Sequence, residues 1–349
     1  MATVTVDGGG TFNFSLGLAP GQTQTTTNFF SSQIGANGIT TIVGQDSAPV
    51  PFSINFGSTG LYFVSGINSV GGAVTLAGGT NTLVGGHTDA PTGLRGNWAI
   101  QTGGGNSNIN LASGADTVIS GGTDTVHAGG ANVLIQVAAG NTHGTAVDVT
   151  SGFVTFVGGA SAGANINLTG TGGGLVQLGS GGGNVARAGN GNTTLIGGGG
   201  GDTLYANTVT GAAGTTLYAT GNDTLIGGGR GADTFFGYSS ISGNGNVLIN
   251  VSTAQTGQDI WLGGGNDTVR MGAGADSLVA SAAHTDGNGL DLIIGWQTND
   301  TLYVDGYAGS VTLTDLGNSV RANLSDGTKI TFQGVAETSA IHIVFGKPG

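Results

Sequence analysis

The sequence predicts an all-β protein built as a parallel β-solenoid, with a β region before the coils and a β-hairpin cap after them. Glycine makes up 74 of the 349 residues, and hydrophobic residues make up 38% in short Val/Ile/Leu/Phe bursts. Units of the form Gly-x-Asp-x-apolar recur between residues 197 and 303. No apolar period of about 3.6 residues persists, so no long helix is expected. Repeats that each supply a turn, a carboxylate and one inward side chain are typical of stacked coils.

The charged residues narrow the class of protein. The chain has seven basic residues and a net charge of −12, which argues against nucleic acid as a partner. Glu337 is the only glutamate among the 19 acidic residues. Aspartate has a short carboxylate that either caps its own turn or reaches a metal ion lying against the backbone. We therefore keep two interpretations of these aspartates: turn caps and metal ligands.

Targeting signals and cysteines bear on the compartment. The chain has no cysteine, which is compatible with an extracellular protein that is cross-linked by metal instead of disulfides. The sequence MATVTVDGGG lacks the basic and apolar regions of a cleavable signal peptide, so we expect none. No apolar run reaches about 18 residues, and we expect no membrane span.

Residues 1–75 form the first predicted domain, a β region without Gly-x-Asp-x-apolar units that serves as a cap or an assembly contact. Alternating or clustered β-branched and aromatic residues predict its strands. These strands are expected at 3–7, 11–16, 39–44, 52–56 and 61–66.

Residues 76–196 form the second predicted domain, a degenerate solenoid. Within 114–136, Asp116 and Asp124 are spaced eight residues apart, and the apolar residues that follow them keep the same spacing. Residues 152–196 stay periodic but lose their acids, so these coils are expected to close with Asn, Thr and Gly hydrogen bonds.

Residues 197–303 form the third predicted domain and carry the strongest repeats. GGGGGDTLY (197–205) and GGRGADTFF (228–236) are followed by the tandem units LGGGNDTVR (262–270) and MGAGADSLV (271–279). These units resemble the repeats-in-toxin (RTX) nonapeptide, in which Gly-Gly-x-Gly-x-Asp-x-apolar-x recurs. The resemblance implies a solenoid whose turns bind Ca²⁺.

Calcium needs six to eight oxygen ligands, which turn carbonyls and one carboxylate from each of two neighbouring coils supply together. Coils of about 18 residues place the ligating turns on one edge. We therefore predict pairing of Asp259 with Asp276, of Asp202 with Asp223, and of Asp267 with Asp286. The candidate calcium ligands are Gly198, Gly200, Asp202, Gly221, Asp223, Gly229, Gly231, Asp233, Gly257, Asp259, Gly263, Gly265, Asp267, Gly272, Gly274, Asp276, Asp286, Gly289, Asp291 and Asp300, with Asp116 and Asp124 as a separate short set.

Residues 304–349 form the fourth predicted domain, a C-terminal cap. Residues 317–335 form a predicted hairpin around Ser325-Asp326-Gly327, and a strand is expected at 341–345. Residues 286–345 resemble the terminal region of RTX proteins, which implies export through a type I secretion channel.

The sequence therefore predicts a secreted, non-enzymatic, calcium-binding structural protein that self-assembles outside the cell, as a surface-layer, matrix or filament subunit. Its expected partners are copies of itself, a cell-surface or matrix polysaccharide, and the export machinery. None of the five histidines lies in a His-Glu-x-x-His motif, and no Gly-x-Ser-x-Gly motif is present. The alternatives are a monomeric adhesin or glycan-binding rod, an ice-binding solenoid, and a polysaccharide enzyme acting on the solenoid face.

Overall fold

The computed structural model describes residues 2–6, 10–14, 41–43, 52–56, 62–65, 71–76, 78–87, 90–207, 214–229, 231–238, 245–284 and 289–349. These residues form β-strands and turns with a single 3₁₀ turn, so the predicted all-β solenoid is confirmed. They include no helix long and apolar enough to cross a membrane. The chain divides into two compact units, Met1–Gly172 and Gly173–Gly349. This boundary falls within the segment 76–196 that we treated as one domain.

The first unit contains β1 (Ala2–Val6), β2 (Gly10–Phe14), β3 (Thr41–Val43), β4 (Phe52–Phe56), β5 (Tyr62–Ser65), β6 (Gly71–Leu76), β7 (Gly78–His87), β8 (Ala90–Thr92), β9 (Leu94–Arg95), β10 (Asn97–Gln101), β11 (Gly104–Ser113), β12 (Ala115–Ser120), β13 (Thr125–Val137), β14 (Ala146–Val157) and β15 (Asn165–Leu168). The strands expected before residue 67 correspond to β1–β5. Residues 22–27, whose repeated threonines suggest an ice-binding surface, and the side chains of 1–70, to which we assign a cap or assembly role, lie outside what the structure describes.

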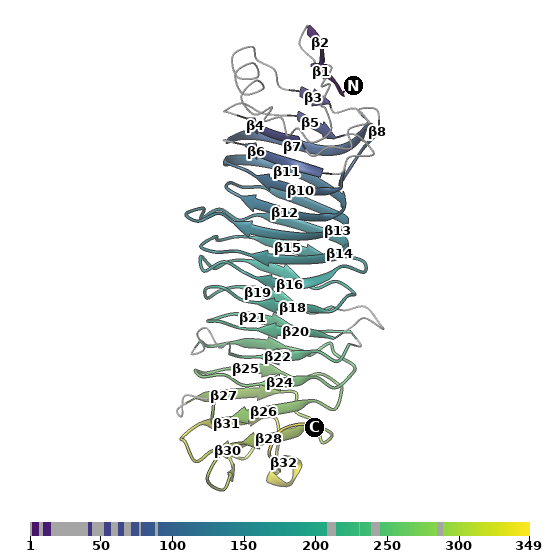
Figure 1. The fold of residues 1–349 in the computed structure, drawn as a ribbon. Helices are drawn as coiled ribbons and strands as arrows, with labels where there is room; N and C mark the ends of the chain where they lie inside the picture. The colour runs from purple at the N-terminus through teal and green to yellow at the C-terminus, as the bar shows by residue number, and fades with distance from the viewer. Residues whose placement is uncertain are drawn as a thin grey trace. The chain divides into compact units, whose positions relative to one another are not determined.

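Parallel pairing stacks the coils of the first unit (Figure 1). Alternate residues of each strand point inward, and equivalent positions on successive coils form buried apolar columns. Strand β13 serves two sides of its coil, because its first half pairs with β11 and its second half with β12. The two inward columns are Val74, Ile100, Val118, Ile135 and Phe156, and Leu83, Ile109, Val126, Val147 and Ile166.

The second unit contains β16 (Gly173–Gln177), β17 (Val185–Arg187), β18 (Thr193–Ile196), β19 (Thr203–Tyr205), β20 (Thr215–Tyr218), β21 (Thr224–Ile226), β22 (Thr234–Phe236), β23 (Leu248–Asn250), β24 (Asp259–Trp261), β25 (Thr268–Arg270), β26 (Ser277–Ser281), β27 (Leu290–Ile294), β28 (Thr301–Asp305), β29 (Thr312–Asp315), β30 (Ser319–Asn323), β31 (Lys329–Gln333), η1 (Thr338–Ala340) and β32 (His342–Phe345). Odd-numbered strands from β17 to β27 form one parallel stack, and even-numbered strands from β16 to β28 form the other.

The repeats of the second unit place one apolar residue inside each short strand. In β19, β21 and β22 only the middle residue is buried, because successive side chains of a strand point to opposite faces. The apolar residue of every Gly-x-Asp-x-apolar unit is fully buried, as predicted. These residues are Leu204, Leu225, Phe235, Val269, Leu278 and Ile293.

The predicted C-terminal hairpin is confirmed. Strands β30 and β31 pair antiparallel, and the turn between them is closed by Gly327 N–H donating to the Leu324 carbonyl over 3.1 Å. Strand β29 extends this hairpin on its outer edge, and the sequence did not predict that strand. The predicted strand at 341–345 is β32, which continues the even-numbered stack beside β28.

Candidate functional site

The aspartates of the RTX-like units lie inside their coils, at the corner that precedes each short strand. The residue before each strand is buried while the strand's own first side chain points outward, so the carboxylates are hidden from solvent. Their exposed fractions are between 0 and 2%. The residues with this position are Asp202, Asp223, Asp233, Asp267, Asp276 and Asp300, and Asp291 is likewise buried as the second residue of β27.

These carboxylates form a first ladder along the odd-numbered stack. The backbone N–H of Asp202 donates to Asp223 Oδ1 on the next coil over 2.9 Å, and Asp267 N–H donates to Asp291 Oδ1 over 2.9 Å. Val247 occupies the position between Asp223 and Asp267, and its N–H donates to Asp267 Oδ1. The ladder therefore contains two pairs of carboxylates on adjacent coils, separated by a coil without one.

A second ladder follows the even-numbered stack. Asp233 N–H donates to Gln258 Oε1 over 3.0 Å, and Gln258 N–H donates to Asp276 Oδ1 over 2.9 Å. Asp276 N–H then donates to Asp300 Oδ1 over 3.0 Å. Asp276 and Asp300 are the carboxylate pair of this ladder, and Gln258 supplies an amide between the acids.

The second carboxylate oxygen caps the corner of its own coil. In most ladder residues Oδ2 accepts a backbone N–H three or four residues earlier, so that a corner donor which could not reach another strand is paired inside the coil. Asp233 differs, because its Oδ2 is buried and accepts no hydrogen bond from the residues that the structure describes. The backbone N–H groups that donate to Oδ2 are those of Gly198 for Asp202, Thr220 for Asp223, Gly263 for Asp267, Gly272 for Asp276 and Gln297 for Asp300.

Burial makes the charged form of these carboxylates costly. Desolvation raises the pKa of Asp233 and of Asp276 to about 6, and the charges of Asp300 and Asp259 raise the Asp276 value further. Burial likewise raises the pKa of Asp223 and Asp300, and the neighbouring charge of Asp202 adds to the effect on Asp223. At neutral pH the ladders are therefore sites where a cation would stabilise the folded chain.

Most of the predicted glycines allow the corners of successive coils to approach closely, whereas a Cβ on Gly200 would lie 3.2 Å from the nearest atom, Asn222 N. A Cβ on Gly274 would lie 2.2 Å from the carbonyl of Thr256, and one on Gly263 would lie 2.2 Å from the Gly237 carbonyl oxygen. Such contacts are shorter than any real Cβ contact, so only glycine fits. Six other predicted glycines would also place a Cβ within 3.0 Å of the neighbouring coil: Gly198, Gly221, Gly257, Gly265, Gly272 and Gly289. Gly229 and Gly265 have positive φ. The Gly231 carbonyl accepts hydrogen bonds from the side chains of Thr256 and Gln258.

One of the three predicted carboxylate pairings is found, one differs in the structure, and one involves a residue outside the described ranges. Asp202 and Asp223 are neighbours, as their spacing predicts. Asp259 is exposed at the start of β24 beside Ser277, and Gln258 takes the ladder position next to Asp276. Asp267 lies next to Asp291, 24 residues away, whereas Asp286 lies outside the described residues. The reason is that coil length varies, from 18 residues between Gln258 and Asp276 to 25 between Asp233 and Gln258.

Asp116 and Asp124 occupy different surroundings in the first unit. Asp116 lies between Trp98 and Val133 of the adjacent coils, and its Oδ1 accepts Trp98 N–H over 2.8 Å. Asp124 Oδ1 accepts Ser107 N–H, and its Oδ2 accepts the hydroxyls of Thr102 and Ser120 over 2.6 and 2.7 Å. The contacts of Asp124 are those of a turn cap.

Asp116 provides a direct test of the cost of burying a carboxylate between two coils. Burial raises its pKa from 3.8 to about 6, and its buried Oδ2 accepts no hydrogen bond from the part of the chain that the structure describes. The folded state thus binds the Asp116 proton more tightly than the unfolded state. The contribution of this proton to the free energy of unfolding is therefore fully present below about pH 4 and is lost as pH rises through about 6. Asp116→Asn should therefore raise the free energy of unfolding by about 3 kcal/mol at pH 8, and by little at pH 4.

The measurement is urea unfolding of both chains across this pH range with calcium chelated, so that only the burial of the carboxylate matters. The amide keeps an acceptor for Trp98 N–H, which makes Asn the matched replacement. Equal stability of the two chains at pH 8 would contradict the expected cost.

Sequence reasoning missed a further ladder, which is built from asparagines on the outside of the coils. Asn246 N–H donates to Asn222 Oδ1 and Asn266 N–H donates to Asn246 Oδ1, each over 2.8 Å. These exposed side chains join the coils beside the aspartate ladder. The Asn-Asp pairs at 222–223 and 266–267 were a signal for it in the sequence.

The three tryptophans have three different roles. Trp98 is buried in the core of the first unit. Trp296 packs edge-on against Phe332 and donates from Nε1 to the Ala340 carbonyl, which closes the last coils of the second unit. Trp261 is half-buried and stacks on Phe236, which stacks in turn on Tyr218 with ring centroids 4.5 Å apart. Because these rings cover one another's faces, they support the sheet and leave little ring face for a sugar.

The donors around both ladders are oxygens of carboxylates, amides, hydroxyls and glycine carbonyls, which suits a hard cation such as Ca²⁺. Among the described residues no three Asp, Glu, His or Cys side chains gather closely enough to hold a metal by themselves. Carbonyls would have to complete any site built on a carboxylate pair. No protein-family model matches this chain, and no curated protein is significantly similar to it.

Proposed function

We propose that the protein is a calcium-stabilised structural solenoid that works outside the cell. The observation that carries this proposal is the stacking of buried carboxylates on adjacent coils: Asp202 with Asp223, Asp267 with Asp291, and Asp276 with Asp300. Two ionised carboxylates one coil apart, at about 4.8 Å, repel by about 3 kcal/mol at an effective dielectric constant of about 20. One divalent cation offsets both charges.

The carboxylate pairs and the glycine carbonyls of their corners would hold the calcium. When bound, calcium neutralises the two charges and links consecutive coils. Asp233 is a further candidate, since its buried Oδ2 is not used by a backbone donor among the described residues. The corners are also held by the chain itself, because the same aspartates accept hydrogen bonds from the backbone N–H groups of their corners.

A structural role suits these carboxylates better than a catalytic one. Each is at most 2% exposed and is bonded to backbone N–H groups, so a substrate in solvent could not reach it. The location outside the cell and the type I export route remain predictions from the RTX resemblance of the terminal region.

Self-assembly is supported by the C-terminal end of the second unit. Ile343 and Phe345 of β32 continue the inward column of Leu302 and Val304, yet Phe345 is 64% exposed. Leu316 in the adjoining hairpin is 49% exposed. Inward apolar residues that reach solvent at the end of a coil stack favour contact with another protein surface.

Calcium removal should unfold the second unit at neutral pH. We expect excess chelator to reduce its β-sheet circular dichroism signal and to lower the melting temperature, because the ladder charges then repel without compensation. Adding calcium back should restore both, and magnesium should not, since it demands a smaller octahedral site. An unchanged spectrum and melting temperature in chelator would refute the calcium proposal.

Assembly should depend on the same metal. Electron microscopy of the purified chain is expected to show filaments or sheets with calcium, and dispersed particles in chelator. Phe345→Ser should weaken assembly while leaving the calcium-dependent circular dichroism intact, and Asp315→Ser on the neighbouring hairpin is the matched control. Dispersed particles under all conditions would favour the monomeric adhesin instead.

A further inference from the structure

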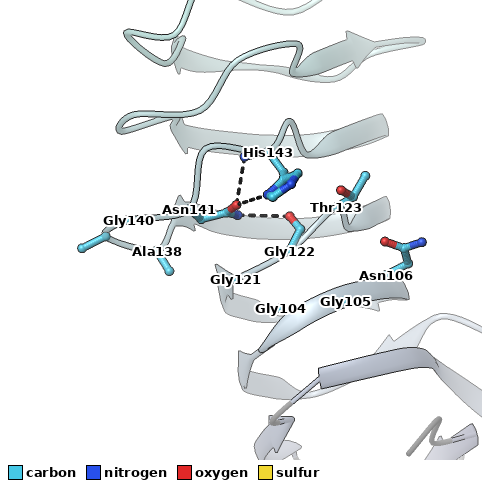
Figure 2. Close-up of a pocket in the computed structure, with 11 residues that line it drawn as sticks. Gly104, Gly105, Asn106, Gly121, Gly122, Thr123, Ala138, Gly140, Asn141 and His143 are labelled. Carbon is cyan, nitrogen blue, oxygen red and sulfur yellow. Dashed lines mark hydrogen bonds between the residues drawn. The ribbon is translucent and has the colours of Figure 1, made fainter.

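A groove lies at one corner of the first unit, where three successive coils turn (Figure 2). Its volume is about 570 Å³, and its lining includes the side chains of Asn106, Thr123, Asn141 and His143. The floor is glycine backbone, because the coils meet there too closely for a side chain. A Cβ on Gly105 would lie 2.1 Å from the Gly79 carbonyl oxygen, and one on Gly122 would lie 2.0 Å from that of Gly105.

The groove holds His143 in a fixed orientation. Asn141 is 7% exposed and donates from Nδ2 to the carbonyls of Ser120 and Gly122 over 3.2 and 3.1 Å. Its Oδ1 accepts from the backbone N–H and from Nδ1 of His143, over 2.9 and 3.2 Å. Since an amide oxygen can only accept, the neutral imidazole carries its proton on Nδ1, and Nε2 is left as an acceptor.

A column of polar side chains continues this surface along the same strands. Asn110, His127, Asp148 and Asn167 are neighbours in register on β11, β13, β14 and β15. His127 Nδ1 lies 3.3 Å from Asp148 Oδ2, and Asn167 Nδ2 donates to Asp148 Oδ1 over 3.3 Å. The His127 and Asp148 side chains are 42% and 45% exposed, so their remaining polar atoms are available to a ligand.

The groove and the column face the same side of the unit. Residues two apart in a strand point the same way, so Asn106, Asn108 and Asn110 form one row on β11 and Thr125 and His127 form one on β13. Thr123 lies in the bend just before β13 and is exposed, which continues the alternation of buried and outward residues along 123–127. A row of this length spans about 13 Å. The surface thus offers amide, hydroxyl and imidazole groups at regular intervals, together with one hollow large enough for a small ring.

We propose that this groove and its polar column bind a neutral polysaccharide. Planar amides and imidazole acceptors match the hydroxyls of sugars, and a repeating surface matches a repeating chain, whose weak contacts add together. Asp148 and the net charge of −12 disfavour a polyuronate. The site uses residues of the first unit alone, and so it is independent of the calcium proposal.

The test is electrophoresis of the full chain through gels that contain dextran, galactomannan or soluble β-glucan, with alginate as the acidic polysaccharide. Retardation is expected in at least one neutral gel, and none in alginate. Gly104→Leu should weaken it about tenfold, because a Cβ there meets nothing within 4 Å and the side chain fills the groove without moving the backbone. His127→Ala should weaken it to a similar extent.

Gln136→Ala is the matched control, since Gln136 is exposed on the half of β13 that serves the other side of the coil. It should migrate as the unsubstituted chain does, and circular dichroism should show that all variants are folded. Absence of retardation in every neutral gel would overturn the proposal. So would retardation that survives both Gly104→Leu and His127→Ala, or inhibition of ice growth without any polysaccharide binding.

Discussion

Asp276→Ala should lower the free energy of unfolding by about 2–5 kcal/mol, because two buried backbone N–H groups lose their acceptor. The donors are Gln258 N–H on the preceding coil and Gly272 N–H in the same corner. Neither can turn to solvent without opening the coil stack. Urea unfolding of the second unit, followed by circular dichroism, measures the loss.

Asp259→Ala is the matched control, because Asp259 lies next to Gln258 on the preceding coil but is exposed on the outer face. It should change the free energy of unfolding by less than about 0.5 kcal/mol. Asp276→Asn should fall between the two, since it keeps an acceptor for one N–H and removes the buried charge. Equal losses for Asp259→Ala and Asp276→Ala would show that the coil register is different.

Gly274→Ala should be comparably damaging for a different reason. The new methyl group would lie 2.2 Å from the carbonyl carbon and oxygen of Thr256 and 2.5 Å from the nitrogen of Gly257. Backbone atoms cannot swing aside as the end of a side chain can, so two coils must separate. The expected loss is about 3 kcal/mol, and it should appear both with and without calcium.

Gly104→Ala is the control for this substitution. A Cβ at Gly104 meets nothing within 4 Å, so the stability should stay the same or rise slightly as the unfolded chain loses freedom. Thermal unfolding of the three chains gives the comparison. A Gly274→Ala chain as stable as the unsubstituted protein would mean that its corner is not packed as the structure has it.

The RTX-like units determined the local structure of the second unit by themselves. Each unit combines a glycine turn, an inward aspartate and one inward apolar residue, and Leu204, Phe235 and Val269 are all fully buried. The hairpin turn at Ser325-Asp326-Gly327 was also predicted from the sequence, because turn residues between two alternating segments specify a hairpin locally. These features depend only on residues close together in the chain.

The sequence alone also limited what the ladder residues could be. A short carboxylate at a glycine corner either caps the corner or binds a cation, and it was expected to occur once per turn. The structure shows that the capping contacts are made, through Oδ2 of Asp202, Asp267 and Asp276. A carboxylate that caps its corner still carries its buried negative charge, so a bound cation would still stabilise the folded chain.

Only the tertiary structure decided which carboxylates meet. Successive ladder residues are separated by 18, 21, 24 or 25 residues, because coils of one stack differ in the length of their corner segments. A fixed period therefore cannot give the register, and it assigned Asp259 to a position that Gln258 holds. The groove could not be predicted from the sequence for the same reason. Its residues Asn106, Thr123 and His143 come together only when three coils of unequal length are stacked.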